Sequence, residues 1–195
     1  GILKQEKIHI NSDHVKIERL FYTSGIKKTE ITFKRKNEKD SQNQSKLVVH
    51  KTEYHFNPKG LLIRKIQFRN NLKHGTETLY YENGLTKKIL NYKYEKLNGK
   101  VTTFNRKKFI ISIAMYKSNK LNGVTVINNK KGQLFTTTTY KNDKKHGIFN
   151  SFDVQKNKRE SGNYFNDLKN GSWIIYSKSG QITSEKKYKN GEMIE

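Results

Sequence analysis

The sequence has no cysteine, a single proline and no long apolar stretch. Without cysteine, a disulfide scaffold, a thiolate metal site and a cysteine nucleophile are all excluded. One proline is too few for a proline-rich linker. The longest apolar cluster, residues 109–115, is interrupted by Ser112 and is much shorter than the roughly 18 residues of a membrane-spanning helix. The sequence therefore predicts no transmembrane segment.

The chain begins at Gly1. The sequence does not show the charged segment followed by an apolar segment that is typical of a signal peptide. We expect either that a targeting segment has been removed or that the sequence is trimmed. The lack of cysteine does not decide the compartment, because many exported proteins also lack it. An exported or cell-surface location and a cytoplasmic one both stay open.

Apolar and acidic residues are scarce. Hydrophobic residues make up 32% of the 195 positions, and 40 Lys+Arg against 17 Asp+Glu give a net charge of +23. Low apolarity with high charge favours disorder. However, Leu, Ile, Val and Phe together supply 48 of the 195 residues, above the roughly 20% below which disorder is expected. We therefore expect a folded chain of one or two domains.

The most informative feature is an internal repeat of 24 residues, which decides the fold class. Glycines recur at this spacing at Gly75, Gly99, Gly123, Gly147 and Gly171. Aromatic residues recur at the same spacing at Phe68, Tyr92, Tyr116, Tyr140, Tyr164 and Tyr188. Two further columns share this period, and they depart from it at Asn128 in an aromatic column and at Lys108 and Lys156 in a glycine column.

The repeat extends toward the N-terminus with a changed spacing. Phe21, Gly25 and Phe33 are spaced like Phe56, Gly60 and Phe68, but they lie 35 rather than 24 residues earlier. We predict one repeat domain over residues 1–195. It would comprise degenerate units at 1–33, an inserted polar loop at 34–46 that is long and exposed, and regular repeats at 47–195.

Each repeat has the pattern of a β-hairpin: two runs rich in aromatic, β-branched and threonine residues, each closed by a turn. The turns after the second run read Asn70-Asn71, Ser118-Asn119, Asn142-Asp143, Asn166-Asp167 and Asn190-Gly191. These residue types tolerate the positive φ of tight hairpin turns. The predicted fold class is all-β, an elongated, twisted, single antiparallel sheet of tandem hairpins. A leucine-rich repeat has a similar period, but the leucines here do not recur in phase.

The recurring pattern Y-x-N-[GDN]-x-x-[NH]-G, followed by an aromatic residue and a turn, resembles the MORN-repeat variant family, which occurs in tandem in bacterial YwqK-like proteins. The resemblance covers residues 50–195 strongly and residues 8–49 weakly, and its clearest unit is residues 164–188. It implies stacked hairpins that serve interaction. The aromatic column is then expected to be structural, with its rings stacking along one face of the sheet; an exposed aromatic platform for a ligand is the alternative.

The histidines do not indicate a catalytic site. His74 and His146 precede repeat glycines, at a position that elsewhere holds asparagine, and we interpret both as residues that adopt a positive φ. His9 and His14 have no repeat phase. His50, His55 and Glu53 form only a faint metal-like pattern.

No nucleophile elbow, phosphate loop, dinucleotide fingerprint or phased carboxylate pair is found in the sequence. We therefore expect no catalytic residue, no metal site and no cofactor.

A basic residue follows the aromatic column in nearly every repeat, with Phe165 as the exception. This basic ladder consists of Lys34, Arg69, Lys93, Lys117, Lys141 and Lys189. We expect it along one edge at intervals of roughly 10 Å, where it could neutralise phosphates of nucleic acid or of anionic lipid head groups. The alternative is that these cations only keep the sheet soluble and discourage edge pairing.

Three functions follow from the sequence. The first is a non-catalytic scaffold for a protein partner, either an antitoxin or immunity protein, as the resemblance to YwqK-like proteins implies, or an exported surface protein. The second is binding of nucleic acid or an anionic membrane surface through the basic ladder. The third is self-assembly as a homo-oligomer through open sheet edges.

Overall fold

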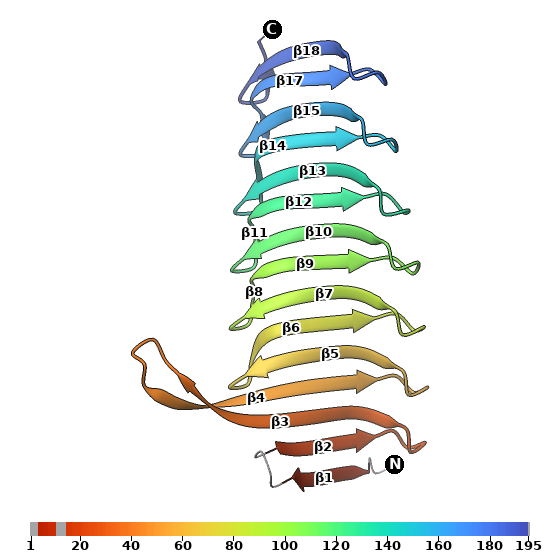
Figure 1. Cartoon of the computed structure of the whole chain (residues 1–195), viewed down its shortest axis with the longest axis vertical. Coiled ribbons are helices and arrows are strands. Elements are labelled where there is room, and N and C mark those ends of the chain that lie inside the picture. Colours follow the sequence, from red (N-terminus) through yellow and green to blue (C-terminus); the bar gives the residue numbers. More distant parts are fainter. Residues whose placement is uncertain (1–3, 11–14, 195) are drawn as a thin grey trace. The chain divides into compact units, whose positions relative to one another are not determined.

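The computed structural model describes residues 4–10 and 15–194, in which the regular elements are β-strands (Figure 1). No helix in these ranges is long and apolar enough to cross a membrane. The chain forms two compact units, residues 1–96 and residues 97–195. The strand pairs within each unit are antiparallel, so the predicted all-β sheet of tandem hairpins is confirmed.

The first unit is a sheet in which each strand pairs with the strand that follows it in sequence. Its strands are β1 (Gln5–Ile10), β2 (Val15–Phe21), β3 (Lys27–Lys39), β4 (Ser45–Phe56), β5 (Leu62–Arg69), β6 (Leu72–Tyr80) and β7 (Thr86–Lys93). The two-residue strand β8 (Lys96–Leu97) lies at the boundary between the units in sequence.

The second unit repeats the same hairpin. Its long strands are β9 (Gly99–Phe104), β10 (Ile110–Lys117), β12 (Gly123–Asn128), β13 (Leu134–Lys141), β14 (Lys144–Phe152), β15 (Lys158–Phe165), β17 (Gly171–Tyr176) and β18 (Ile182–Lys189). Its short strands, which follow tight turns, are β11 (Lys120–Leu121), β16 (Leu168–Lys169) and β19 (Glu192–Met193).

The tight turns lie where the sequence predicted them. Asn142 and Asp143 have φ angles of 51° and 70°, and Asn70 and Asn71 have φ angles of 48° and 64°. Two successive positive φ angles are typical of type I′ hairpin turns, whose twist matches that of the flanking strands. The asparagine and aspartate pairs therefore close the hairpins.

Residues 34–46 are not the long loop that the sequence predicted. Strands β3 and β4 stay paired through this segment, beginning with Lys34 opposite His50, and the extended hairpin projects past the β5–β6 turn (Figure 1). The Asp40 side chain accepts amide hydrogens two and four residues on, as Asn57 does in a regular repeat turn. Asp40 thus supplies the turn chemistry that closes two longer strands, although the segment is mostly exposed, as expected.

Side chains alternate between two faces of each sheet. We call the face that carries the aromatic column the aromatic face and the other the opposite face. On the aromatic face, Ile66 is fully buried, and Val101 and Trp173 are 5% and 3% exposed. Val48 is equally buried on the opposite face. Because each sheet is a single layer, these residues are buried by neighbours on the same face.

Candidate binding edge

The basic ladder lies on the opposite face, where the second strand of a hairpin reaches its tight turn. Lys93 ends β7 in the first unit, and Lys117, Lys141 and Lys189 end β10, β13 and β18 in the second. All four lysines are exposed. The strand register thus brings a cation to the same corner of each of these hairpins.

Lys34 does not lie at such a corner, because β3 continues past it. It stands opposite His50, which in turn stands opposite Arg69. The expectation that the basic ladder lies along one edge is therefore wrong for Lys34, because the inserted segment is a pair of strands.

Arg69 is occupied by an acid of the inserted segment. Its Nη2 atom donates to Glu38 Oε2 at 2.5 Å, and its Nη1 atom donates to the hydroxyl of Tyr94 at 2.9 Å. His50 Nε2 lies 2.6 Å from Glu38 Oε1. This hydrogen bond from His50, together with the charge of Arg69, holds the pKa of Glu38 below its ordinary value, although desolvation opposes the shift. The ion pair with Glu38 thus removes Arg69 from the cations of the ladder that are available to a partner.

The exposed lysines of the ladder have no such acid. Among the described residues, no carboxylate pairs with Lys93, Lys117, Lys141 or Lys189. An ammonium group without an acidic partner does not have to break an existing ion pair before it contacts a phosphate or an acidic side chain. These corners are therefore the candidate binding groups of the edge.

A repeating pair of hydrogen bonds joins successive turns in the second unit. The amide of Asp143 donates to the carbonyl of Leu121 at 3.0 Å, and its carboxylate accepts from the amide of Leu121 at 2.7 Å. Asp167 and Lys145 repeat the arrangement at 2.9 and 2.8 Å. These bonds fix the spacing of the corners that carry the lysines.

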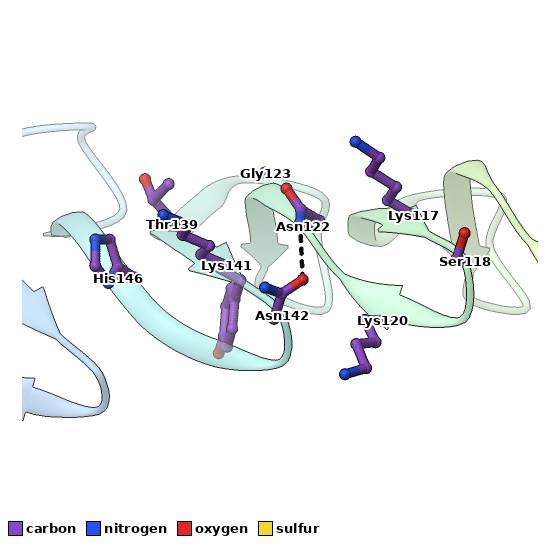
Figure 2. Close-up of a pocket in the computed structure, with 10 residues that line it drawn as sticks. Lys117, Ser118, Lys120, Asn122, Gly123, Thr139, Lys141, Asn142 and His146 are labelled. Carbon is purple, nitrogen blue, oxygen red and sulfur yellow. Dashed lines mark hydrogen bonds between the residues drawn. The ribbon is translucent and has the colours of Figure 1, made fainter.

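A recess of about 720 Å³ opens at this edge in the second unit. Figure 2 shows it between the β10–β11 turn, which carries Lys117 and Lys120, and the end of β13, which carries Lys141. Asn122 lies between the two turns and donates a long hydrogen bond of 3.4 Å to the side chain of Asn142. The residues that line the recess include three lysines and no acid.

His74 and His146 do not have the positive φ that the sequence predicted. The glycines that follow them, Gly75 and Gly147, have φ angles of 97° and 102° instead. Because glycine adopts this conformation at no steric cost, the preceding residue can remain extended. The His74 ring meets Tyr94 with centroids 4.8 Å apart, and burial, together with the nearby cations of the edge, lowers the pKa of His74.

The rings of the aromatic column do not stack on one another. Successive rings lie two strands apart, roughly 9.6 Å, and in several repeats a lysine lies between them. Lys51 Nζ lies 4.0 Å from the ring centroid of Phe68, and Lys145 Nζ lies 4.9 Å from that of Tyr164. Part of the aromatic face is thus built from cation–π contacts, each worth roughly 0.5–1 kcal/mol where exposed, whereas Trp173 contacts the rings of Phe149 and Tyr164 directly.

Two carboxylates recur at the repeat spacing, although the sequence predicted no phased carboxylate pair. Glu53 and Glu77 lie 24 residues apart and both face the fully buried Ile66 across the sheet. Glu77 is 6% exposed and accepts from Arg64 Nε at 2.6 Å. Burial, together with the charge of Glu77, raises the pKa of Tyr92 to about 12.

The 24-residue spacing of Glu53 and Glu77 in the sequence could have identified this pair. Glu53 pairs with Lys51 at 2.9 Å as Glu77 pairs with Arg64. Both carboxylates are therefore neutralised within the sheet, and their arrangement is that of structural ion pairs.

The faint metal-like pattern is divided between the two faces. Glu53 and His55 lie on the aromatic face, 3.2 Å apart, and His50 lies on the opposite face beside Glu38. No group of three His, Cys, Asp or Glu side chains that could hold a metal ion occurs in the described part of the chain. His14 and the side chain of His9 lie outside the described residues.

Comparisons with known proteins add little to this geometry. No model of a known protein family matches the chain, and no curated protein matches it significantly. Among solved structures, a porin-like protein from Bacteroides uniformis is similar at 8% identity and a TM-score of 0.19, over 97% of this chain and 91% of the other. A similarity this weak supports no conclusion on fold or function.

Proposed function

We propose that the chain is a non-catalytic repeat scaffold that binds a protein partner through its open sheet. The observation that supports this best is a pair of exposed aliphatic side chains on the opposite face of the second unit. Val124 on β12 and Ile148 on β14 lie either side of β13 and are 47% and 60% exposed. Exposed apolar side chains contribute most to the free energy of binding when a partner covers them and removes them from water.

The resemblance to the MORN-repeat variant family supports an interaction role. We propose that the biological setting is that of an antitoxin or immunity protein, or of an exported surface protein. In either setting the sheet would act by binding and would carry out no chemistry.

The test is site-specific photo-crosslinking in lysate of the source cells. A photoreactive residue at position 148 should trap one defined protein, and the same residue at the exposed turn position of Lys178 should not. Equal labelling from both positions, or measured hydrolase or transferase activity of the purified chain, would contradict the proposal.

A second candidate function is binding of a polyanion through the basic ladder. It is favoured by the exposed turn lysines, which have no acid partner among the described residues. Reversing Lys93, Lys117 and Lys141 to Glu should abolish binding of DNA, RNA or acidic vesicles at low salt, and binding by the parent should weaken steeply as salt is added. A triple variant that binds as well as the parent would show that the ladder is only a solubilising surface.

A further inference from the structure

The recess between Lys117 and Lys141 combines positive charge with neutral hydrogen-bonding groups. Lys117, Lys120 and Lys141 contribute ammonium groups, and Asn122 and His146 contribute polar side chains (Figure 2). Asp143, which follows the lining residue Asn142, directs its carboxylate to the amide of Leu121 at 2.7 Å. The residues that line this hollow thus include three cations and no negative charge.

The corresponding position one repeat later is filled. Phe165 stands where the recess has Lys141, and His146 stands where it has Asn122. The Phe165 and His146 rings meet with centroids 5.0 Å apart. In that repeat, a ring therefore occupies the space that corresponds to the open recess between Lys117 and Lys141.

The corresponding position in the first unit is filled as well. The Tyr94 ring lies 4.8 Å from that of His74, which corresponds to Asn122. Arg69, which corresponds to Lys117, is paired with Glu38. The recess of the second unit therefore lacks the ring that both counterparts have, and its lysines, unlike Arg69 of the first unit, pair with no carboxylate among the described residues.

We propose that this recess binds a phosphate group of a nucleic-acid strand. Ammonium and amide donors are the groups that recognise phosphate oxygens in proteins. The lining contains no exposed aliphatic side chain of the kind that inserts into a lipid surface, which favours a nucleic acid over a membrane. The proposal rests on the second candidate function, polyanion binding, and gives it a defined site.

The test uses inorganic pyrophosphate and short oligo(dT) as probes and follows amide signals by NMR. Pyrophosphate should shift the Gly123 amide saturably. Lys141→Phe, which copies the filled repeat, should weaken this binding about tenfold or more, as expected for the loss of a charged hydrogen bond. Phe165→Lys should open the filled position and create a second saturable response at Gly147. Lys178→Gln, at the other end of a hairpin, removes one charge and should leave the Gly123 response unchanged.

The results distinguish a failure of the recess proposal from a failure of polyanion binding by the ladder. If Lys141→Phe and Lys178→Gln weaken pyrophosphate binding equally, or if pyrophosphate shifts Gly171 as much as Gly123, the recess proposal fails while ladder binding of oligo(dT) can still hold. If the parent binds neither probe, both proposals fail. Tighter binding to phosphatidylserine vesicles than to oligo(dT) would overturn the choice of a nucleic acid. Circular dichroism should show that Lys141→Phe folds like the parent. Lys141→Gln, which removes the charge without adding a ring, should also weaken pyrophosphate binding.

Discussion

The indole ring of Trp173 lies over Gly162 on the neighbouring strand, so closely that a β-carbon added to Gly162 would come within 2.1 Å of Trp173 Cε3. The same indole stacks on Phe149 with ring centroids 5.5 Å apart. The equivalent pair one hairpin earlier is Phe149 opposite Thr138. A large residue in this row is thus accommodated by a small one across the strand pair.

Gly162→Ala should therefore lower the free energy of unfolding by about 3 kcal/mol, because the ring has to move out of a packed position. Trp173→Val should cost a similar amount through lost packing. The double variant removes the overlap between the added methyl group and the indole, and it should be at least about 1 kcal/mol more stable than the sum of the single effects. Denaturant unfolding followed by far-UV circular dichroism measures this cycle, and strict additivity would contradict it.

The hydrogen bond between Asp167 and Lys145 should be needed to hold adjacent turns together. Asp167→Ala should lower the free energy of unfolding by about 1–2 kcal/mol, because it removes a charged acceptor. Asp167→Asn should retain most of the stability, because Asn119 makes the same bond to the amide of Leu97 at 2.7 Å. Thermal unfolding of the three proteins decides the point, and equal losses in both variants would contradict this role of the side-chain oxygen.

Lys108 and Lys156 occupy turn positions where most other repeats have glycine. Their φ angles are 67° and 71°, a region in which side chains other than glycine are strained. Lys108→Gly and Lys156→Gly should each raise the free energy of unfolding by about 0.5–1 kcal/mol. Lys107→Gly, at a neighbouring position without a positive φ, is the matched control and should not stabilise. A melting temperature unchanged by either substitution would argue against strain at these turns.

Glu53 should make stability depend on pH in the acid range. Burial would raise its pKa, but the hydrogen bond and charge of Lys51, together with His55, outweigh burial and lower the pKa below the ordinary value of 4.5. A carboxyl whose pKa is lowered by folding contributes stability above its unfolded pKa, and this is lost as the pH falls through the folded pKa. Glu53→Gln should flatten the pH dependence of urea unfolding below pH 4.5. An unchanged slope would show that Glu53 titrates normally.

Glu38→Gln should release Arg69 to join the basic ladder. If the ladder binds polyanions, one more phosphate contact should steepen the dependence of log K for oligo(dT) on log salt by about 0.7. Glu82→Gln, at an exposed turn, makes the same change in net charge without freeing an arginine and should leave the slope as in the parent. Identical slopes for Glu38→Gln and Glu82→Gln would place Arg69 outside the binding surface.

The features that the sequence predicted are encoded locally. The tight turn at Asn142 and Asp143 follows from the tolerance of these residue types for positive φ, and the hairpins follow from residue type within each 24-residue period. Neither inference needs to know which residues meet across the sheet. The strand pairs and turns could therefore be placed without a structure.

The features that it missed depend on contacts between distant positions. The pairing of Glu38 with Arg69 joins residues 31 positions apart and requires that residues 34–46 form strands, which a polar composition does not indicate. The conformation of His74 was assigned by analogy with asparagine, whereas the following glycine adopts the positive φ. The recess beside Lys141 arises from the absence of a ring that a neighbouring repeat supplies.

Within each unit, long strands pair with the long strands next to them in the chain, so contacts in the sheet have a short sequence separation. Such low contact order favours rapid folding, and hairpins that touch mainly their neighbours can nucleate the fold at several places. Removing or adding one complete 24-residue repeat within a unit would leave every other strand beside a partner of the same kind. The length of this chain can therefore change in steps of one hairpin without requiring a new fold.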